Sequence, residues 1–402
     1  MKHILRNFLQ LPQSIWAIGI VSLLINVSSV IVFMASPYYL TKVFGVTTIG
    51  LGFIEGLVEF TAWATRIISG MTSDYMSKRK PALVVAYGLN FISRILFVLA
   101  PGIGLFFLAR SIDRLSNGIQ ATPREALVGD LAPKHLKGAS YGLRQTLSVA
   151  GSVLGALVMI AFFLESGENY SYLFIAATIP PLFALYVMLC HVRDVPREKM
   201  MGPLHPTKIF SWSSIVSLSN NYWRVVAVAC FFTLSNYSGA FLLIHAEKVG
   251  ISQHLIPLVM VVQNFSAMIA YPIGRLSDRM DRRYLLAIGF FMVVISGVIL
   301  ALAYNIWMAL LGAAFWGLHI GINQSLLMAK VADTTVPETR GTAFGVFYLL
   351  IGITLFLSNN IMGWISHHMS PSASFITSAL IAGVAIFSLP LIKSYKKKNI
   401  EA

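Results

Sequence analysis

Seven charged side chains lie within long apolar stretches of the sequence, where an unpaired charge is costly. A carboxylate in such surroundings can take up a proton, because burial disfavours its charged form while a nearby arginine favours it. A guanidinium group there can bind an anion through its planar fork of donors. Such groups are the first candidates for a functional site. The seven are Glu55, Glu59, Arg94, Arg110, Asp113, Arg114 and Arg144.

The spacing of these residues places most of them on two helix faces. Residues four apart share a face, so Glu55 lies with Glu59. Arg110, Asp113 and Arg114 share a second face. With three acids against four arginines, pairing would leave one guanidinium group to receive an anion. We expect Glu59 or Asp113 to carry a proton and Arg114 to be its exchangeable partner. The alternative is that the charges form ion pairs that only stabilise the N-terminal bundle.

The composition indicates which elements carry these residues. Hydrophobic residues make up 56% of the 402 positions and charged residues only 11%, against about 45–50% and about 25% in soluble domains. The apolar residues come in blocks of about 20, the length of a membrane-spanning helix. This excludes a soluble enzyme, a disordered chain and a disulfide scaffold. Twelve spans are predicted, near residues 14–36, 48–71, 81–101, 103–126, 138–164, 170–192, 222–246, 253–275, 284–303, 306–330, 341–366 and 372–392.

The basic residues test this count and give the orientation. The net charge is +14, and Lys and Arg accumulate in the cytoplasmic loops of membrane proteins. With the N-terminus inside, the predicted outside loops carry only Lys42 and Lys248. We therefore expect both termini to be cytoplasmic. We also expect the protein to be embedded in the lipid bilayer and not to bind nucleic acid. No cleavage site follows the first apolar block, which is interpreted as an uncleaved span.

The two halves of the chain share a repeated pattern. A glycine, an acid four residues later and a basic pair occur in Gly70 to Arg79 and again in Gly274 to Arg283. At nearly the same offset, Asp130 recurs as Asp333. The repeat and a polar, basic midpoint predict three parts: an N-terminal six-helix bundle over 1–192, a cytoplasmic linker over 193–221, and a C-terminal six-helix bundle over 222–402.

The loop pattern Gly70-x-x-x-Asp74 with its trailing basic residues, present twice, resembles the cytoplasmic loop signature of the major facilitator superfamily. Arg114-x-x-x-Gly118 resembles the second motif of that superfamily. The run from Arg110 to Leu127 is similar to a bacterial subgroup described as efflux-type permeases. That subgroup usually has an acid three residues after the position of Arg144, and its antiporters have a Pro in the span-five glycine motif. This sequence has neither.

The resemblance implies an all-α integral membrane protein of the bacterial inner membrane, with twelve transmembrane helices in two parallel six-helix repeats. It also implies that the loop signatures act as gates, and that spans one, four, seven and ten line a central cavity. The gating residues are then Gly70, Asp74, Arg79, Gly274, Asp278 and Arg282. The substrate-binding candidates are Asn26, Arg110, Arg114, Arg144, Asn236, His319 and Asn323. For the neutral ones, the alternative is an interhelical hydrogen bond.

The sequence contains no phosphate-binding glycine loop, paired metal-ligand histidines or nucleophile motif, and its two cysteines match no ligand spacing. We expect no enzymatic activity, metal or cofactor. The predicted function is secondary active transport of a small organic solute by alternating access, coupled to protons, by a monomer. The arginines of the first half favour an organic anion or an anionic chelate, such as a carboxylate siderophore. The alternatives are a broad-specificity drug exporter, a lipid transporter and a non-transporting receptor.

Overall fold

The computed structural model describes residues 11–75, 79–133, 136–166, 170–194, 215–269, 280–335 and 340–392, and the regular structure in these ranges is helical. The helices of the first half of the sequence are α2 (Gln13–Tyr38), which continues into the π-helical turn η1 (Tyr39–Val43), α3 (Thr48–Tyr75), α4 (Lys80–Leu99), α5 (Ile103–Leu131), α6 (Lys137–Ser166) and α7 (Tyr170–His191). Those of the second half are α9 (Asn220–Thr233), α10 (Gly239–Lys248), η2 (Gln253–Leu255), α11 (Pro257–Ile269), α13 (Arg282–Ala301), α14 (Ile306–Asp333), α15 (Arg340–His368), α16 (Pro371–Ser388) and η4 (Leu389–Leu391).

Each of the twelve predicted spans contains a helix, and eight helical segments in the described ranges are long and apolar enough to cross a membrane. The helices outside that set differ in charge or in length; α11, for example, has 13 residues. α3 and α5 are long enough, but they carry the charged residues identified above. The seventh predicted span, over 222–246, is not one helix but two shorter ones, α9 and α10.

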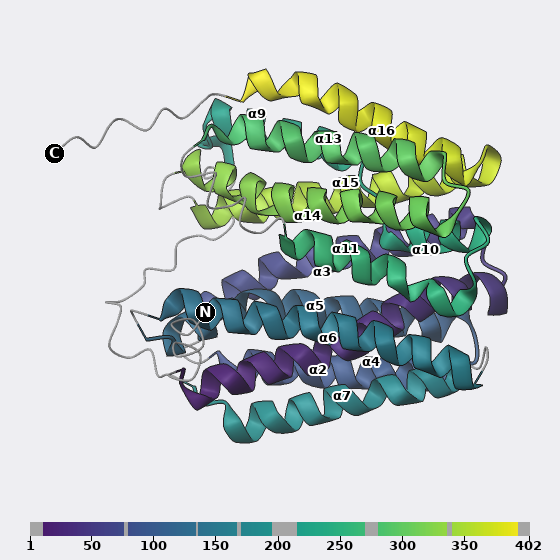
Figure 1. The fold of residues 1–402 in the computed structure, drawn as a ribbon. Helices are drawn as coiled ribbons and strands as arrows, with labels where there is room; N and C mark the ends of the chain where they lie inside the picture. Colours follow the sequence, from purple (N-terminus) through teal and green to yellow (C-terminus); the bar gives the residue numbers. More distant parts are fainter. Residues whose placement is uncertain are drawn as a thin grey trace, which may run out of the picture. The chain divides into compact units, whose positions relative to one another are not determined.

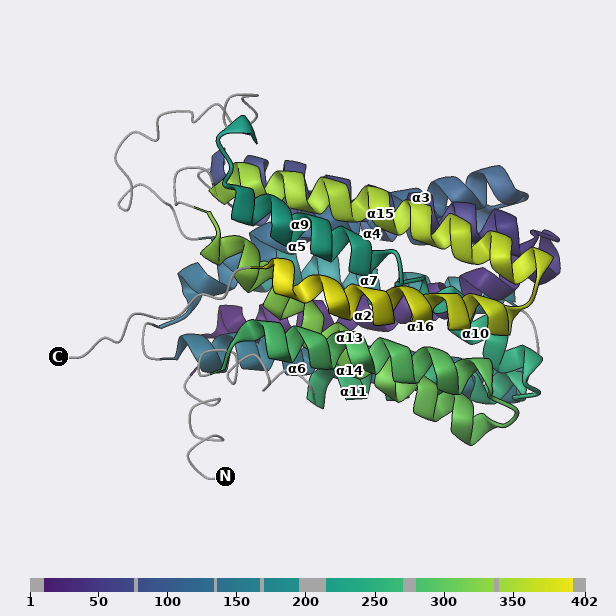
Figure 2. The same ribbon diagram turned by 90° about the horizontal axis from the view of Figure 1, so that it is seen from above.

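The chain divides into two compact units. The first unit comprises residues 1–46 and 57–207, and the second comprises residues 47–56 and 208–402. The start of α3, Thr48 to Gly56, therefore packs within the second unit. In the first unit, α2 packs against α6 and α7, and α4 packs against α5 and α7 (Figure 1). In the second, α13 packs against α14 and α16, and α9 lies beside α15 (Figure 2).

Polar side chains cap the first turn of several helices. The side chains of Ser219, Asn305 and Ser370 accept hydrogen bonds from the first turn of α9, α14 and α16, as N-cap residues do. α4 has no such cap of its own. Instead, Asp194, which follows α7, accepts hydrogen bonds from the backbone amides of residues 79 and 80, at 3.2 and 3.1 Å. The end of α7 thus fixes the start of α4.

The break between α9 and α10 is stabilised by polar side chains from a neighbouring helix. Residues 234–238 read Leu-Ser-Asn-Tyr-Ser, and such short polar side chains compete for backbone hydrogen bonds. The Ser358 hydroxyl donates to the Leu234 carbonyl at 2.8 Å, and the Ser238 amide donates to Asn359 Oδ1 at 2.8 Å. Because the freed backbone groups are satisfied in this way, an interruption is tolerated at the centre of an apolar segment.

Many apolar side chains point away from the packed interior. On α7, seven of them are between 46 and 60% exposed: Tyr172, Ile175, Ile179, Leu182, Phe183, Tyr186 and Leu189. A soluble protein rarely exposes a continuous apolar surface of this kind. In a lipid environment such a surface is favourable, because the lipid tails are themselves apolar.

Two glycines of α6 allow α2 to approach closely. A Cβ at Gly155 would lie 2.6 Å from the Val27 carbonyl oxygen, and one at Gly151 would overlap the Leu23 carbonyl oxygen. Since the obstacle is backbone in both cases, a side chain could be accommodated only by moving α2. Small residues at helix contacts serve this purpose in membrane proteins.

We predict that Gly151→Ala and Gly155→Ala each lower the midpoint of thermal unfolding, because overpacking costs about 1–3 kcal/mol. Gly142 lies in the same helix with open space around its Cβ position. Gly142→Ala should therefore leave the midpoint unchanged or raise it slightly, since Ala favours a helix by about 1 kcal/mol. The midpoints are measured on purified protein in detergent. Equal midpoints for the three variants would contradict this account of α2–α6 packing.

Candidate functional site

The carboxylate of Asp113 lies at the centre of a buried cluster of charges in the first unit. Asp113, on α5, and Arg94, on α4, are both fully buried. Arg94 Nη2 lies 2.8 Å from Asp113 Oδ1, and the amide of Asn90, one turn before Arg94, donates to the same oxygen at 3.1 Å. A charge-assisted pair of this geometry is among the stronger polar contacts in proteins.

The remaining donors of Arg94 bind hydroxyl groups. Its Nε donates to Ser28 Oγ at 2.6 Å, and its Nη2 donates to Ser29 Oγ at 3.3 Å, both on α2. Its Nη1 donates to Ser93 Oγ at 3.0 Å. These hydrogen bonds matter because a buried guanidinium donor without an acceptor destabilises the folded protein. Arg94 therefore connects α2, α4 and α5.

Arg114 lies between two acids at the outer side of this cluster. Its Nε is 3.6 Å from Asp113 Oδ2, and its Nη1 is 3.9 Å from Glu59 Oε1. The Arg114 and Glu59 side chains are 16 and 27% exposed, whereas Asp113 and Arg94 are almost completely enclosed. The expected association of these three residues is thus present, but the tightest partner of Asp113 is Arg94.

Arg110 and Arg114 converge on one aromatic ring. The guanidinium carbon of each lies 5.7 Å from the centre of the Phe33 ring, which α2 contributes. Both distances are within the range of a cation–π contact. The arrangement brings two arginines from successive turns of α5 together beside α2.

The charged groups described above are the three guanidinium groups of Arg94, Arg110 and Arg114 and the two carboxylates of Asp113 and Glu59.

A second set of charges lies towards the end of α5. Glu125 Oε1 is 3.1 Å from Arg144 Nη2 on α6 and 3.5 Å from Arg124 Nη2. Glu125 is 40% exposed, so these pairs are accessible to solvent. The predicted substrate-binding residue Arg144 is thus placed with Glu125 and not with the Asp113 cluster.

The two loop signatures form matching ion pairs. Arg79 Nε lies 3.0 Å from Asp130 Oδ2 in the first unit, and Arg282 pairs with Asp333 in the second. Both members of the second pair are 203 residues after those of the first. Gly70 lies in α3, whereas the side chain of Asp74 and the whole of Gly274 and Asp278 lie outside the described residues.

The structure separates Glu55 from Glu59. Glu55 is fully buried within the second unit, where the Ser238 hydroxyl donates to its Oε2 at 2.8 Å. Ser238 is the N-cap residue of α10. The carboxylate therefore lies at the positive end of a helix dipole, a favourable position for a negative charge.

The neutral candidates have different surroundings. Asn26 donates to Ser148 Oγ at 2.8 Å, and Ser152 Oγ donates to Asn26 Oδ1 at 3.5 Å, so Asn26 links α2 to α6. In the second unit, both amide atoms of Asn323, which is 3% exposed, have no hydrogen-bond partner among the described residues. The same holds for Asn236 Oδ1. Asn26 is thus an interhelical contact, while the other two retain hydrogen-bonding capacity.

Aromatic residues stand in the second half of the chain at the positions that the repeat relates to the charged cluster. Trp316 stacks on Tyr237, with ring centres 4.1 Å apart, and its centre is 4.4 Å from that of His319. Trp316 stands 203 residues after Asp113, and Gly317 stands 203 residues after Arg114. The repeat therefore provides charge in one unit and aromatic surface in the other.

Sequence reasoning missed the partners that hold these groups. Asn90, Ser28, Ser238 and Asn359 were not recognised, since uncharged polar residues are common in membrane helices and carry a weak signal alone. The recurrence of Asp130 as Asp333 marked a repeat, and it could also have indicated two equivalent partners for the loop arginines.

No group of three or more metal-binding side chains occurs in the described part of the chain. Cys190 and Cys230 are free thiols.

Apolar helices of membrane-spanning length, exposed apolar surface and buried charges define a multi-pass helical membrane protein. The family model described as the Major Facilitator Superfamily matches residues 18–245 and 225–402. The chain belongs to this superfamily of membrane transporters.

Similar proteins support the assignment. An uncharacterised MFS-type transporter of Methanocaldococcus jannaschii is 26% identical over 388 residues, which cover 94% of each chain. The crystal structure of a mutant of the nucleoside transporter NupG has a TM-score of 0.80 at 12% identity, covering 94% of this chain and all of that one. The human organic anion transporter MFSD10 has a TM-score of 0.64 at 14% identity, covering 94 and 99%. At these identities the two solved structures establish the fold alone.

We predict that Arg94→Met and Asp113→Asn each destabilise the protein strongly, because each leaves its partner's charge buried and unpaired. Breaking a buried pair costs about 3–5 kcal/mol. The double variant removes both charges and should recover most of the loss in the midpoint of thermal unfolding.

Arg144→Gln is the matched control for this prediction. The Arg144 side chain is only 10% exposed, but its partner Glu125 is 40% exposed, so water solvates the remaining carboxylate and the loss of stability should be smaller than in Arg94→Met. A double variant that is less stable than either single variant would contradict the assignment of Arg94 and Asp113 as one paired unit.

Proposed function

We propose that the protein is a proton-coupled secondary transporter of a small organic anion, which includes anionic chelates of the siderophore type. The observation that carries this proposal is the convergence of the Arg110 and Arg114 guanidinium groups on the Phe33 ring. Two guanidinium groups can hold one carboxylate through several donors. Phe33 offers an apolar surface to the rest of the solute.

The degree of burial favours Arg114 over Arg94 as the anion-binding arginine. Arg94 is fully enclosed and bound to Asp113 at 2.8 Å. Arg114 is 16% exposed, and its contacts with Asp113 and Glu59 are longer than a hydrogen bond. An arriving carboxylate can therefore compete with these two longer contacts of Arg114.

The same geometry favours Glu59 over Asp113 as the residue that carries the proton. Asp113 is held by Arg94 and Asn90, whereas Glu59 is 27% exposed and lies 3.9 Å from Arg114. When an anion occupies Arg114, Glu59 loses part of the positive charge beside it, which favours proton uptake. Anion and proton would then be bound together, and this is the coupling that a gradient-driven transporter requires.

A second candidate substrate class is neutral and aromatic, such as a nucleoside. The stacked Tyr237 and Trp316 rings and the unsatisfied amide of Asn323 favour it, because planar heterocycles bind by stacking and by amide hydrogen bonds. The nucleoside transporter of similar fold is consistent with this alternative. No comparable feature among the described residues favours drug export or lipid transport.

Thermal stabilisation of the purified protein separates these possibilities. A ligand that binds only the folded state raises the unfolding midpoint. The panel contains mono- and tricarboxylates, ferric carboxylate chelates, nucleosides, lipophilic cations and phospholipids. We expect a carboxylate to stabilise the wild type, Arg114→Lys to retain part of this effect, and Arg114→Ala to lose it. Asn323→Ala should reduce the stabilisation only if the stabilising ligand is a nucleoside.

The coupling residue is tested in liposomes with the carboxylate identified in this way. Glu59→Gln should remove the dependence of uptake on an imposed pH gradient, while Asp113→Asn should impair folding first. Stabilisation only by lipophilic cations, unaffected by Arg114→Ala, would overturn the anion proposal. Unchanged pH dependence in Glu59→Gln would overturn the coupling role alone.

A further inference from the structure

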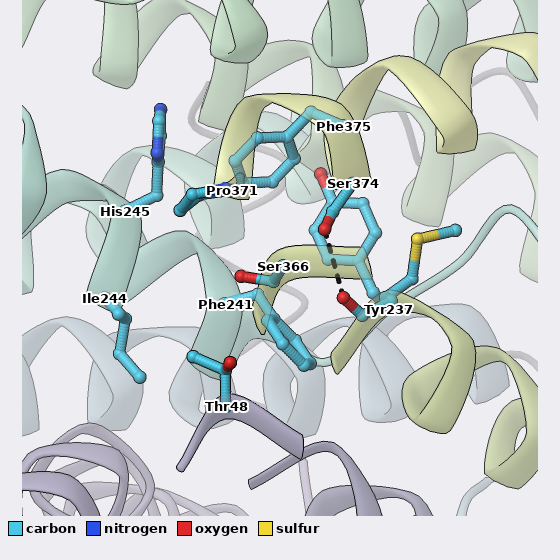
Figure 3. A pocket seen from close by; sticks show the side chains of 10 residues that line it. Thr48, Tyr237, Phe241, Ile244, His245, Ser366, Pro371, Ser374 and Phe375 are labelled. Atoms are coloured by element: carbon cyan, nitrogen blue, oxygen red, sulfur yellow. Dashed lines mark hydrogen bonds between the residues drawn. The ribbon is translucent and has the colours of Figure 1, made fainter. Parts of the chain in front are cut away.

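The pocket shown in Figure 3 is too small to bind a solute. It lies in the second unit, and its lining includes Tyr237, Phe241 and Phe375. The space open to the centre of a water molecule is about 10 Å³, which is close to the minimum that holds one water. A place for a larger ligand is found instead among the charged side chains at the C-terminal end of α5.

Two arginines from different helices converge there on one oxygen atom. Arg144 Nη2, on α6, lies 3.1 Å from Glu125 Oε1, and Arg124 Nη2, on α5, lies 3.5 Å from the same oxygen. Guanidinium groups are well suited to recognising a carboxylate, because their donors match its geometry. In this structure the carboxylate belongs to the protein itself. Glu125 therefore occupies a position that an anion can fill.

The two arginines have further hydrogen bonds that do not involve Glu125. Arg124 Nη1 donates to Gln120 Oε1 at 3.2 Å, and Gln120 is buried. Arg144 Nη2 also donates to Gln145 Oε1, at 2.8 Å. The side chains of Arg124 and Arg144 are largely enclosed, with 17 and 10% exposed. Their guanidinium groups are thus held in place when Glu125 moves away.

The side chain of Glu125 is less confined than its partners. It is 40% exposed, and among the described residues its carboxylate contacts only these two arginines. Tyr141 binds Glu125 through the backbone carbonyl alone, at 3.0 Å. A rotation of the side chain therefore places the carboxylate in water, which solvates it. The enclosed arginines then need another anion, because a buried charge without a partner is unfavourable.

We propose that Arg124 and Arg144 form a second anion-binding site, in which the Glu125 carboxylate is exchanged for the carboxylate of a soluble organic anion. The exchange keeps both arginines beside a negative charge, whether the ligand is bound or absent. Glu125 also limits the affinity of the site, because a ligand must displace it. That this ligand is the transported solute rests on the proposed function, whereas the existence of the site does not.

The second site is separate from Arg114 but lies along the same helix. Arg114, Asn117, Gln120 and Arg124 follow one another at spacings of three or four residues, so they lie along one side of α5. Gln120 Nε2 donates to Asn117 Oδ1 at 3.1 Å, which continues the row of hydrogen bonds from Arg124. At 1.5 Å per residue, Arg114 and Arg124 are about 15 Å apart along the helix. One small carboxylate cannot contact both.

Citrate binding to the purified full-length protein tests the proposal. Dissociation constants are measured by isothermal titration calorimetry in detergent at constant ionic strength. Glu125→Gln removes the competing charge and keeps the shape of the side chain. We expect this variant to bind citrate about tenfold more tightly than the wild type, as the removal of one charge-assisted contact would give. Glu125→Asp keeps the charge on a shorter side chain and should give an intermediate affinity.

The matched control is Glu165, which is exposed near the other end of α6. Glu165→Gln removes the same charge and should leave the affinity for citrate unchanged. Two double variants then identify the site. The tighter binding of Glu125→Gln should persist when Arg114→Ala is added, and it should disappear when Arg144→Gln is added.

Three results would overturn the second site: an unchanged affinity in Glu125→Gln, a gain that Arg144→Gln does not remove, or a gain that requires Arg114. Failure of the proposed function gives a different result. Arg114→Ala would then leave citrate binding to the otherwise wild-type protein unaffected, whatever Glu125→Gln does.

Discussion

The neutralisation of charge in an apolar bundle is the constraint on which the first unit depends. Asp113 is fully enclosed, and a carboxylate in that position is stable only with a partner of opposite charge. Arg94 supplies this charge from α4, and its other donors bind hydroxyls on α2. The relative placement of α2, α4 and α5 thus follows from the hydrogen-bonding needs of two side chains. Arg110 and Arg114 lie beside this fixed centre, with both guanidinium groups against the Phe33 ring.

Hydropathy and basic-residue placement predicted most of the fold, because membrane spans are long, uniform and separated by charged loops. The break in the seventh span was missed, since a hydropathy average hides five residues within an apolar segment. The break depends on partners that are distant in sequence: Ser358 and Asn359 bind it from α15, and Ser378 of α16 binds the Ser235 carbonyl. A local pattern does not contain this information.

The candidate site was predicted in part for a similar reason. Spacing along α5 placed Asp113 and Arg114 together, because helix geometry alone determines which residues share a face. Spacing could not show that Arg94 is closer to Asp113 than Arg114 is, since this depends on how α4 packs against α5. Spacing likewise joined Glu55 to Glu59, although α3 begins in the second unit and Glu55 meets Ser238 there. Pairing between helices is a property of packing, which one sequence does not specify.

The ion pairs of the two loop signatures bear on how the chain arose. Arg79 with Asp130 and Arg282 with Asp333 are related by the same shift of 203 residues. The charges at Asp113 and Arg114 have no such counterpart, because Trp316 and Gly317 stand in their places. An ancestral six-helix segment that was duplicated would already have carried the loop pair in both copies. On this account the ionic interior of one copy and the aromatic interior of the other would have diverged after the duplication.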